Sequence, residues 1–351
     1  MTDDEAITRQ LHERWGPLAA ASRARQVPDQ ETKERILQRI LQEPPDQQPQ
    51  RRRHRWTGRQ RFLVGGVAAV AMAVVVAALT VVLWPSHATS AYAATPPGLN
   101  YQPGPQLPAA TVLQQLASAA QATDRPGGGT VEYLRIESWD LNASIDGQQV
   151  TTAVVPSETQ IWRQPDDAAV TIARYGTPWF PDDDAEQAWK ANRSPGSDTT
   201  PRRTDDPPGG HAWLWDDRPP PNADQLRAWL RRNHNITDTG GYFTAVVDLL
   251  KERVLTGKEL ASVLRLLASL PTVDYTGPVT DRTGRPGEAF STTSTSGGLP
   301  VRHTLIVDRT SGRFLAYERT LTTTAGSLNV RIPAVTSYVI FHDARFTTGT
   351  P

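Results

Sequence analysis

Cysteine is absent from this sequence of 351 residues. Its absence excludes thiolate zinc sites, redox-active cysteine pairs and cysteine nucleophiles. It also excludes acylation at a lipoprotein-type cysteine, so a membrane anchor would have to be a spanning segment. A chain of this length can bury a core of its own without disulfides.

A net charge is absent as well, because 37 basic side chains balance 37 acidic ones. The charge is nevertheless unevenly distributed, since residues 1–61 hold 13 basic and 9 acidic side chains. The rest of the chain therefore carries a surplus of acidic groups. A surplus of this sign does not suit nucleic acid, and we expect no nucleic-acid partner.

Motifs of common enzyme classes are missing too. The sequence has no G-x-S-x-G elbow, no H-E-x-x-H and no P-loop. His342 and Asp343 adjoin, but neighbours on a strand face opposite ways. The aspartate runs at residues 182–184, 205–206 and 216–217 lack the glycine turn of a calcium loop and favour solvated loops. We expect no enzyme, no metal and no cofactor; an exported hydrolase is the alternative that no motif favours.

One long apolar run is present, from Phe62 to Trp84, with Thr80 its only plainly polar side chain. Twenty-three helical residues rise about 34 Å, which exceeds a hydrocarbon core of about 30 Å. The run predicts a single transmembrane helix over residues 62–84. A cleaved signal peptide with a site at Ala91–Ala93 is the weaker alternative, because the run and its leader are both too long.

The flanks of this run predict its orientation. Six arginines precede it between Arg51 and Arg61, and the next basic residue is Arg125. Positive charge stays on the cytoplasmic side, so residues 1–61 are predicted inside and the C-terminal domain outside the cell membrane. Gly65, Ala69, Ala73 and Ala77 form a small-residue stripe that could pair two helices, although an alanine-rich run gives such a stripe by chance.

The cytoplasmic region is predicted to hold two short amphipathic helices. The second has an apolar stripe on one side and stops at Pro44. Two such helices cannot enclose a core, so the region is either an unstructured tail or a docking stripe for a cytoplasmic regulatory protein. The stripe consists of Ile36, Leu37, Ile40 and Leu41.

Residues 85–110 are rich in proline and predict a stiff stalk. The domain over 111–351 is predicted to start with a helix capped by Thr111. Four strands should follow, at 130–139, 149–155, 158–163 and 168–175. A long irregular insert is expected over 176–221.

Three helices are expected after the insert, the first capped by Asn222 and the last by Thr256. Five strands should then complete the domain, at 273–279, 287–295, 300–308, 313–323 and 336–346. Strands, helices and strands in this order predict an α+β fold. We expect a curved antiparallel β-sheet covered by helices, a half-barrel-like ectodomain preceded by one transmembrane helix.

The insert is polar but contains large aromatic side chains that must pack somewhere. Two interpretations stay open: a lid over the sheet, or a groove for an apolar or carbohydrate ligand. Trp213 and Trp215 are the first candidates for ligand contact, because alternate residues of an extended segment share a side. The four candidate ligand-binding residues are Trp179, Trp189, Trp213 and Trp215.

Several segments occur together in an order that is similar to one known family. They are the apolar helix at 31–41, the arginine cluster, the Val/Ala span, the segments at 226–230, 266–271 and 284–287, and the hairpin at 306–315. The chain resembles actinobacterial single-pass membrane proteins of unknown function, often encoded beside extracytoplasmic-function sigma factors. The resemblance implies a link to sigma-factor signalling and supplies no catalytic residue. Zinc-binding anti-sigma domains differ, because their H-x-x-x-C-x-x-C pattern needs cysteine.

Two functions remain open from the sequence. The first is a membrane-anchored extracytoplasmic sensor, regulatory or binding protein without catalytic activity. The alternative is an apolar-ligand or lipid-binding carrier-like domain held at the membrane, because the strand–helix–strand outline is similar to lipoprotein-carrier-like half-barrels at fold level. The second function requires a real cavity beneath the helices.

Overall fold

The computed structural model describes residues 95–102, 107–123, 126–146, 149–180, 183–191, 194, 196–326, 328 and 330–351. The span predicted at Phe62–Trp84 and the docking stripe at Ile36–Leu41 lie outside these residues. Within them, no helix combines the length and hydropathy that a membrane crossing needs.

Fourteen helices and strands occur within the described ranges. In chain order they are α3 (Ala109–Gln121), β1 (Val131–Asp146), β2 (Gln149–Arg163), β3 (Ala169–Tyr175), α4 (Asp183–Ala191), β4 (Arg202–Asp206), α5 (Ala223–Leu230), α6 (Thr239–Glu252), α7 (Gly257–Ala268), β5 (Asp274–Thr280), β6 (Pro286–Ser294), β7 (Val301–Val307), β8 (Phe314–Leu321) and β9 (Ala334–Thr347).

The nine described strands form one antiparallel sheet in the order β4-β3-β2-β1-β9-β8-β7-β6-β5. The last strand of the chain, β9, pairs with the first, β1, and so joins the two predicted groups of strands into one sheet. The edge strands β4 and β5 do not pair with each other, so the sheet is open. The expected α+β class, with one antiparallel sheet and helices, is confirmed.

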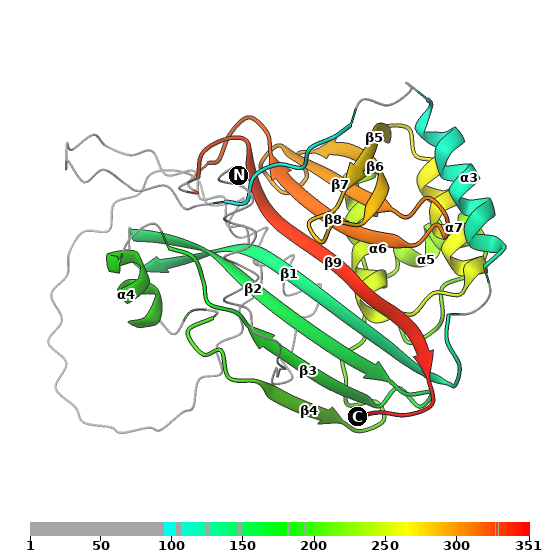
Figure 1. Ribbon diagram of the computed structural model, residues 1–351, viewed down its shortest axis with the longest axis horizontal. Helices are drawn as coiled ribbons and strands as arrows, with labels where there is room; N and C mark the ends of the chain where they lie inside the picture. The colour runs from blue at the N-terminus through cyan, green and yellow to red at the C-terminus, as the bar shows by residue number, and fades with distance from the viewer. Residues whose placement is uncertain are drawn as a thin grey trace, which may run out of the picture. The chain divides into compact units, whose positions relative to one another are not determined.

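Helices cover one face of this sheet, here called the helical face (Figure 1). Along a strand alternate residues point to opposite faces. Leu305 and Val307 therefore join the core beneath the helices, and Ile306 joins a second cluster on the opposite face. The main core packs side chains of α6 and α7, such as Phe243 and Leu264, against β1 and β6 to β9.

Local sequence signals explain where the three central helices start. Asn222 caps α5 by accepting from the backbone N–H of Asp224 and Gln225. Thr256 and Glu259 form the reciprocal capping box that the sequence predicts for α7. In the hairpin between β7 and β8, Gly312 has φ +66°, as the sequence suggests for a turn glycine.

The predicted boundaries are wrong at α3. This helix begins at Ala109, with Pro108 as its N-cap and without a side-chain cap, and Thr111 lies within its first turn. Proline suits the start of a helix, because the first N–H groups have no partner inside the helix.

One predicted strand break is also wrong. Residues 149–155 and 158–163 form the single strand β2, which runs through Pro156. The N–H and C=O of a strand residue point to the same neighbouring strand. Pro156 O accepts from Gly176 N at 2.8 Å, one residue past the end of β3. The missing N–H of Pro156 therefore faces a side where the β3 ladder has already ended.

The insert is more regular than the sequence suggests, since it contains α4 and β4. Trp189 of α4 packs against Ala153 and Val155 of β2, and β4 extends the sheet beyond β3. Part of the predicted stalk also contacts the domain, because Tyr101 pairs with Val279 of β5. The segment 95–102, which we call the docked stalk segment, lies against the sheet.

Candidate functional site

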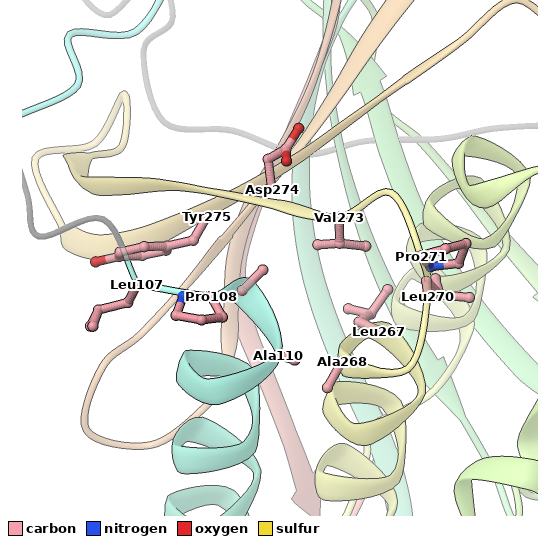
Figure 2. Close-up of a pocket in the computed structure, with 11 residues that line it drawn as sticks. Leu107, Pro108, Ala110, Leu267, Ala268, Leu270, Pro271, Val273, Asp274 and Tyr275 are labelled. Carbon is pink, nitrogen blue, oxygen red and sulfur yellow. The ribbon is translucent and has the colours of Figure 1, made fainter.

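A groove of about 530 Å³ lies between the start of α3, the end of α7 and the start of β5. Figure 2 shows Leu107 and Pro108 on one side and Leu267, Leu270 and Val273 on the other. Eleven residues line it: Leu107, Pro108, Ala109, Ala110, Leu267, Ala268, Leu270, Pro271, Val273, Asp274 and Tyr275.

Helix ends and small side chains create this space. α3 and α7 pack side by side (Figure 1), with Ala110 and Ala268 at the ends that face the groove. An alanine side chain reaches only one carbon, so it leaves volume that a leucine would fill. α7 ends at Ala268, and Pro271 follows. Because proline cannot continue the helix, the chain leaves the direction of α7 and enters β5, and the space beside the start of α3 stays open.

The side chains that line the groove are mostly apolar, but polar atoms make up more than half of the surface that is open to it. Asp274 carries the only ionisable charge among the lining residues, and its carboxylate points away from the two helices in Figure 2. Leu107 stands at the margin with 44% of its surface exposed, the largest exposed fraction of any big apolar side chain in the described ranges. The groove therefore combines mostly apolar side chains with polar atoms and one carboxylate at its edge.

Tyr275 provides the polar edge of the groove. Its ring packs 5.5 Å from the ring of Phe290, and its hydroxyl donates to Glu288 Oε2 at 2.5 Å. Burial and the bond to Glu288 raise the pKa of Tyr275 to about 12. The hydroxyl is therefore protonated at neutral pH, and its proton is held by Glu288.

The predicted tryptophans lie elsewhere, at three separate places. Trp189 packs on β2, and Trp179 pairs through its backbone with Val154 on the face opposite the helices. Trp215 is buried in the main core, where it stacks on Trp229 at 4.7 Å. Trp213 lies beneath the guanidinium of Arg163 at 4.1 Å.

None of these four tryptophans lines the groove. Trp213 and Trp215 differ in surroundings although both contact Arg163, whose Nη2 donates to Trp215 O at 3.0 Å. Their rings are used in packing, and a ligand role for them stays a prediction.

A buried polar cluster beneath the start of α6 was not predicted from the sequence. His303 Nδ1 lies 2.7 Å from the Tyr317 hydroxyl, and Ser294 Oγ donates to Asp238 Oδ2 at 2.5 Å. Burial, with help from Arg319, lowers the pKa of His303 to about 4, so the ring is neutral at pH 7. A serine hydrolase needs its serine bonded to the histidine. Here serine bonds to aspartate and histidine to tyrosine, which is a different arrangement.

The aspartate runs are spread over separate elements. Asp183 and Asp184 begin α4, Asp205 pairs with Arg203 on β4, and Asp217 pairs with Arg232. Within the part of the chain that the structure describes, no group of three acidic or histidine side chains is placed to hold a metal ion.

Comparisons with known proteins find solved structures of low similarity, of which two are named here. A DUF1329 family protein from Desulfovibrio piger is 9% identical with a TM-score of 0.19. A LolA superfamily protein from Nitrosomonas europaea is 11% identical with a TM-score of 0.13. Each match covers 70% of this chain and 96% of the other. At these scores the likeness carries no argument about function.

No protein-family model matches the chain, and a search among curated proteins finds no match. The function must therefore be inferred from the groove itself. The sequence contains one weak signal for it: Leu107, Ala110 and Ala268 occur where helices begin and end beside prolines. Ala268 lies 158 residues after Ala110, so only the fold could bring the two ends of the groove together.

Proposed function

We propose that this chain is a membrane-anchored, extracytoplasmic binding protein whose half-barrel-like domain holds an apolar ligand in the groove between α3, α7 and β5. The observation that supports this most directly is a groove of about 530 Å³ whose lining side chains are mostly apolar, with Asp274 as the one charged group among them. Small-molecule sites span about 300–1,000 Å³ and are lined mainly by apolar side chains, with few polar groups. The groove has this size, and most of its lining side chains are apolar.

The lining also favours binding over catalysis. Its side chains include no histidine, serine, lysine or arginine, and its one hydroxyl is engaged with Glu288. Its one carboxylate, Asp274, points away from the two helices (Figure 2). A reaction would require a nucleophile or a base within reach of the ligand. We therefore propose a non-catalytic role.

Anchoring is part of the same proposal and rests on the sequence. The uncharged run at Phe62–Trp84 follows an arginine-rich flank, which favours a cytoplasmic N-terminus and an external domain. The sigma-factor link and the docking stripe at Ile36–Leu41 stay hypotheses from the sequence. A pull-down with residues 1–61 that recovers no cytoplasmic protein would count against them.

Photo-crosslinking of the full chain, reconstituted in lipid nanodiscs, tests the proposal. The probe is palmitate carrying a diazirine and an alkyne tag, and labelled peptides are mapped by mass spectrometry. We expect labels on residues 107–110 and 267–275. Ala110→Trp should fill the groove and lower labelling by about tenfold, which corresponds to about 1.4 kcal/mol of binding free energy.

A matched control is available on the same helix. Ala122 is exposed and lies twelve residues from Ala110, about 18 Å along the helix direction. Ala122→Trp should leave labelling unchanged. Equal labelling of the two variants, or labels confined to other surfaces, would falsify the proposal.

A further inference from the structure

β4 is an edge strand of the sheet (Figure 1), and within the described ranges no strand pairs with its outer side. It consists of Arg202, Arg203, Thr204, Asp205 and Asp206, all of them exposed or half-buried. Alternate residues of a strand turn their backbone N–H and C=O groups to opposite sides. The outer side of β4 therefore presents backbone donors and acceptors with which another strand could pair.

The charges of β4 follow an order that is complementary to itself. Two cations precede the neutral Thr204, and two anions follow it. When two copies of such a strand run antiparallel, with Thr204 opposite Thr204, each arginine lies opposite an aspartate of the other copy. Opposite charges that face each other across strands stabilise a pair, and like charges destabilise it. A parallel pairing in register would place arginine against arginine, so the order of the charges favours the antiparallel pairing.

The neighbouring strand β3 makes no use of this charge order. None of the four charged residues of β4 lies opposite a charged residue across the ladder between β3 and β4. Their partners in this ladder are Ala169, Val170, Ile172 and Ala173. The charge order therefore does not serve the pairing inside the domain, and its complement has to come from the open side.

Arg203 and Asp205 form an exposed ion pair on one face of β4. Arg203 Nε and Nη2 donate to the Asp205 carboxylate at 2.7 to 3.0 Å, and Arg203 Nη1 donates to Pro351 O at 3.2 Å. The side chains of Arg203 and Asp205 are 44% and 59% exposed. A guanidinium and a carboxylate each have more hydrogen-bonding sites than these contacts use. Both groups can therefore hold a second partner from another chain.

The charges on the other face of β4 are engaged more firmly. Arg202 binds Asp198 at 2.6 Å, and Asp206 binds His211 at 2.7 Å with its own side chain only 10% exposed. Substitution at Asp206 would therefore disturb contacts inside the domain. Because their side chains are exposed, Arg203 and Asp205 are the positions at which charge can be changed with little effect on the fold.

From these observations we infer that β4 pairs with β4 of a second copy of this chain, around a two-fold axis at Thr204. The two nine-stranded sheets then form one continuous antiparallel sheet. The interface is isologous, because the same residues of both copies contribute to it. Five residues a side bury less than the about 1,200–2,000 Å² of a stable interface, so the dimer is weak and depends on its charges. The inference is independent of the groove.

Disulfide cross-linking of the full chain in detergent tests the pairing. The chain has no cysteine, so Thr204→Cys gives one thiol per copy. Residues directly opposite each other in an antiparallel pair have Cβ atoms about 4.5–5.5 Å apart, which is close to disulfide geometry. Thr199→Cys is the matched control, because Thr199 is exposed but lies outside β4. We expect mild oxidation to link Thr204→Cys at least about tenfold faster than Thr199→Cys, because pairing raises the local thiol concentration.

Exchange of charges distinguishes paired β4 strands from other contacts between copies. Added to Thr204→Cys, Arg203→Asp sets aspartate opposite aspartate, and Asp205→Arg sets arginine opposite arginine. Each variant alone should cross-link at least about fivefold more slowly than the parent. A mixture of the two, with different affinity tags, restores opposite charges and should form mixed dimers at the parent rate. Salt at about 1 M should slow the parent, because it shortens the Debye length to about 3 Å.

Three outcomes would overturn the inference. The first is equal cross-linking of Thr204→Cys and Thr199→Cys. The second is cross-linking that both charge variants leave unchanged, because the copies would then meet through another surface. The third, on oxidation in the membranes of the expressing cells, is a Thr204→Cys adduct with a different protein and none with itself. Rapid formation of mixed dimers would support the inference and show that both variants fold. Palmitate labelling of the groove is unaffected by any of these results, so the two proposals stand or fail separately.

Discussion

The two ends of α7 are built in opposite ways. At its N-terminal end, Glu259 accepts from Thr256 and from Arg218, and Arg218 also bonds Glu132 on β1. Glu132 in turn binds Arg253 Nη1 at 2.8 Å and Val254 N at 2.7 Å. At the C-terminal end, Ala268 and Leu270 line a groove in which Asp274 is the one charged side chain. Charged hydrogen bonds close one end, and small side chains leave the other open.

This difference separates stability from binding within one helix. A buried carboxylate with several donors tolerates little change, because removing its charge takes the carboxylate partner from the buried Arg253. A half-open groove lined by alanine and leucine tolerates substitution, because solvent or ligand can occupy the space. The four predictions below use this contrast, and they are ordered by the size of the expected effect.

Glu132→Gln should cause the largest loss, about 3–5 kcal/mol of unfolding free energy, because it removes the carboxylate charge that binds Arg253 and one of the two carboxylates that bind Arg218. Denaturant unfolding of the full chain in detergent, followed by tryptophan fluorescence, measures it. The control is Glu186→Gln on α4, whose ion pair with Lys190 is exposed and should contribute at most about 0.5 kcal/mol. Similar losses of unfolding free energy in both variants would mean that burial does not make the Glu132 pair more important than the Glu186 pair.

Gly257→Ala, at the N-terminal end of α7, should lower the unfolding free energy by about 1–3 kcal/mol. A Cβ at Gly257 would lie 2.2 Å from Thr123 O and 2.3 Å from Ala120 O, so α3 and α7 would have to separate. The better helix propensity of alanine is worth less than this clash. Gly128→Ala is the control, because its Cβ would meet no atom within 4 Å. Unchanged unfolding of Gly257→Ala would show that the helices can separate freely.

Glu252→Gln should flatten the pH dependence of stability. Burial raises the pKa of Glu252 to about 7, although Leu214 N donates to both carboxylate oxygens at 3.0 Å and Arg163 lies near. A raised carboxyl pKa gives stability that is complete below about pH 4.5 and is lost as the pH rises through about 7. Unfolding curves between pH 4 and 8 should show this fall in the parent chain and a smaller fall in the variant. A parallel fall in both would assign it to another group.

Ala268→Leu should have the smallest effect on stability, within about 0.5 kcal/mol, because the position is only partly buried beside open space. The same change should reduce palmitate labelling, since the leucine would occupy groove volume. Ala228→Leu on the exposed side of α5 offers a comparison with the same added atoms. Loss of stability without loss of labelling at Ala268→Leu would mean that the position belongs to the core.

Much of the fold could be predicted from local patterns. The caps at Asn222 and Thr256 and the glycine turn at Gly312 are encoded within a few residues, so the elements beside them were located correctly. Errors arose where a neighbour decided the outcome. Pro156 stays in β2 because β3 ends beside it, and α3 starts at Ala109 without any side-chain cap.

The candidate site could not be predicted in the same way. Tryptophans are the largest apolar side chains of the insert, and the sequence cannot tell whether they pack inward or face a ligand. Trp189 and Trp215 are each only 1% exposed, because β2 and the main core lie beneath them. The groove instead depends on alanines, whose small size is informative only once the helices around them are placed.

By itself the sequence determined the absence of cysteine chemistry and the apolar run at Phe62–Trp84. It also determined the antiparallel α+β class and the capped helix starts. Each of these depends on composition or on neighbours within a few residues. Only the tertiary structure decided that β1 and β9 join, that residues 95–102 dock on β5, and that Leu107, Ala268 and Tyr275 surround one space. Those contacts link residues far apart in the chain, and packing, which no local pattern encodes, selects them.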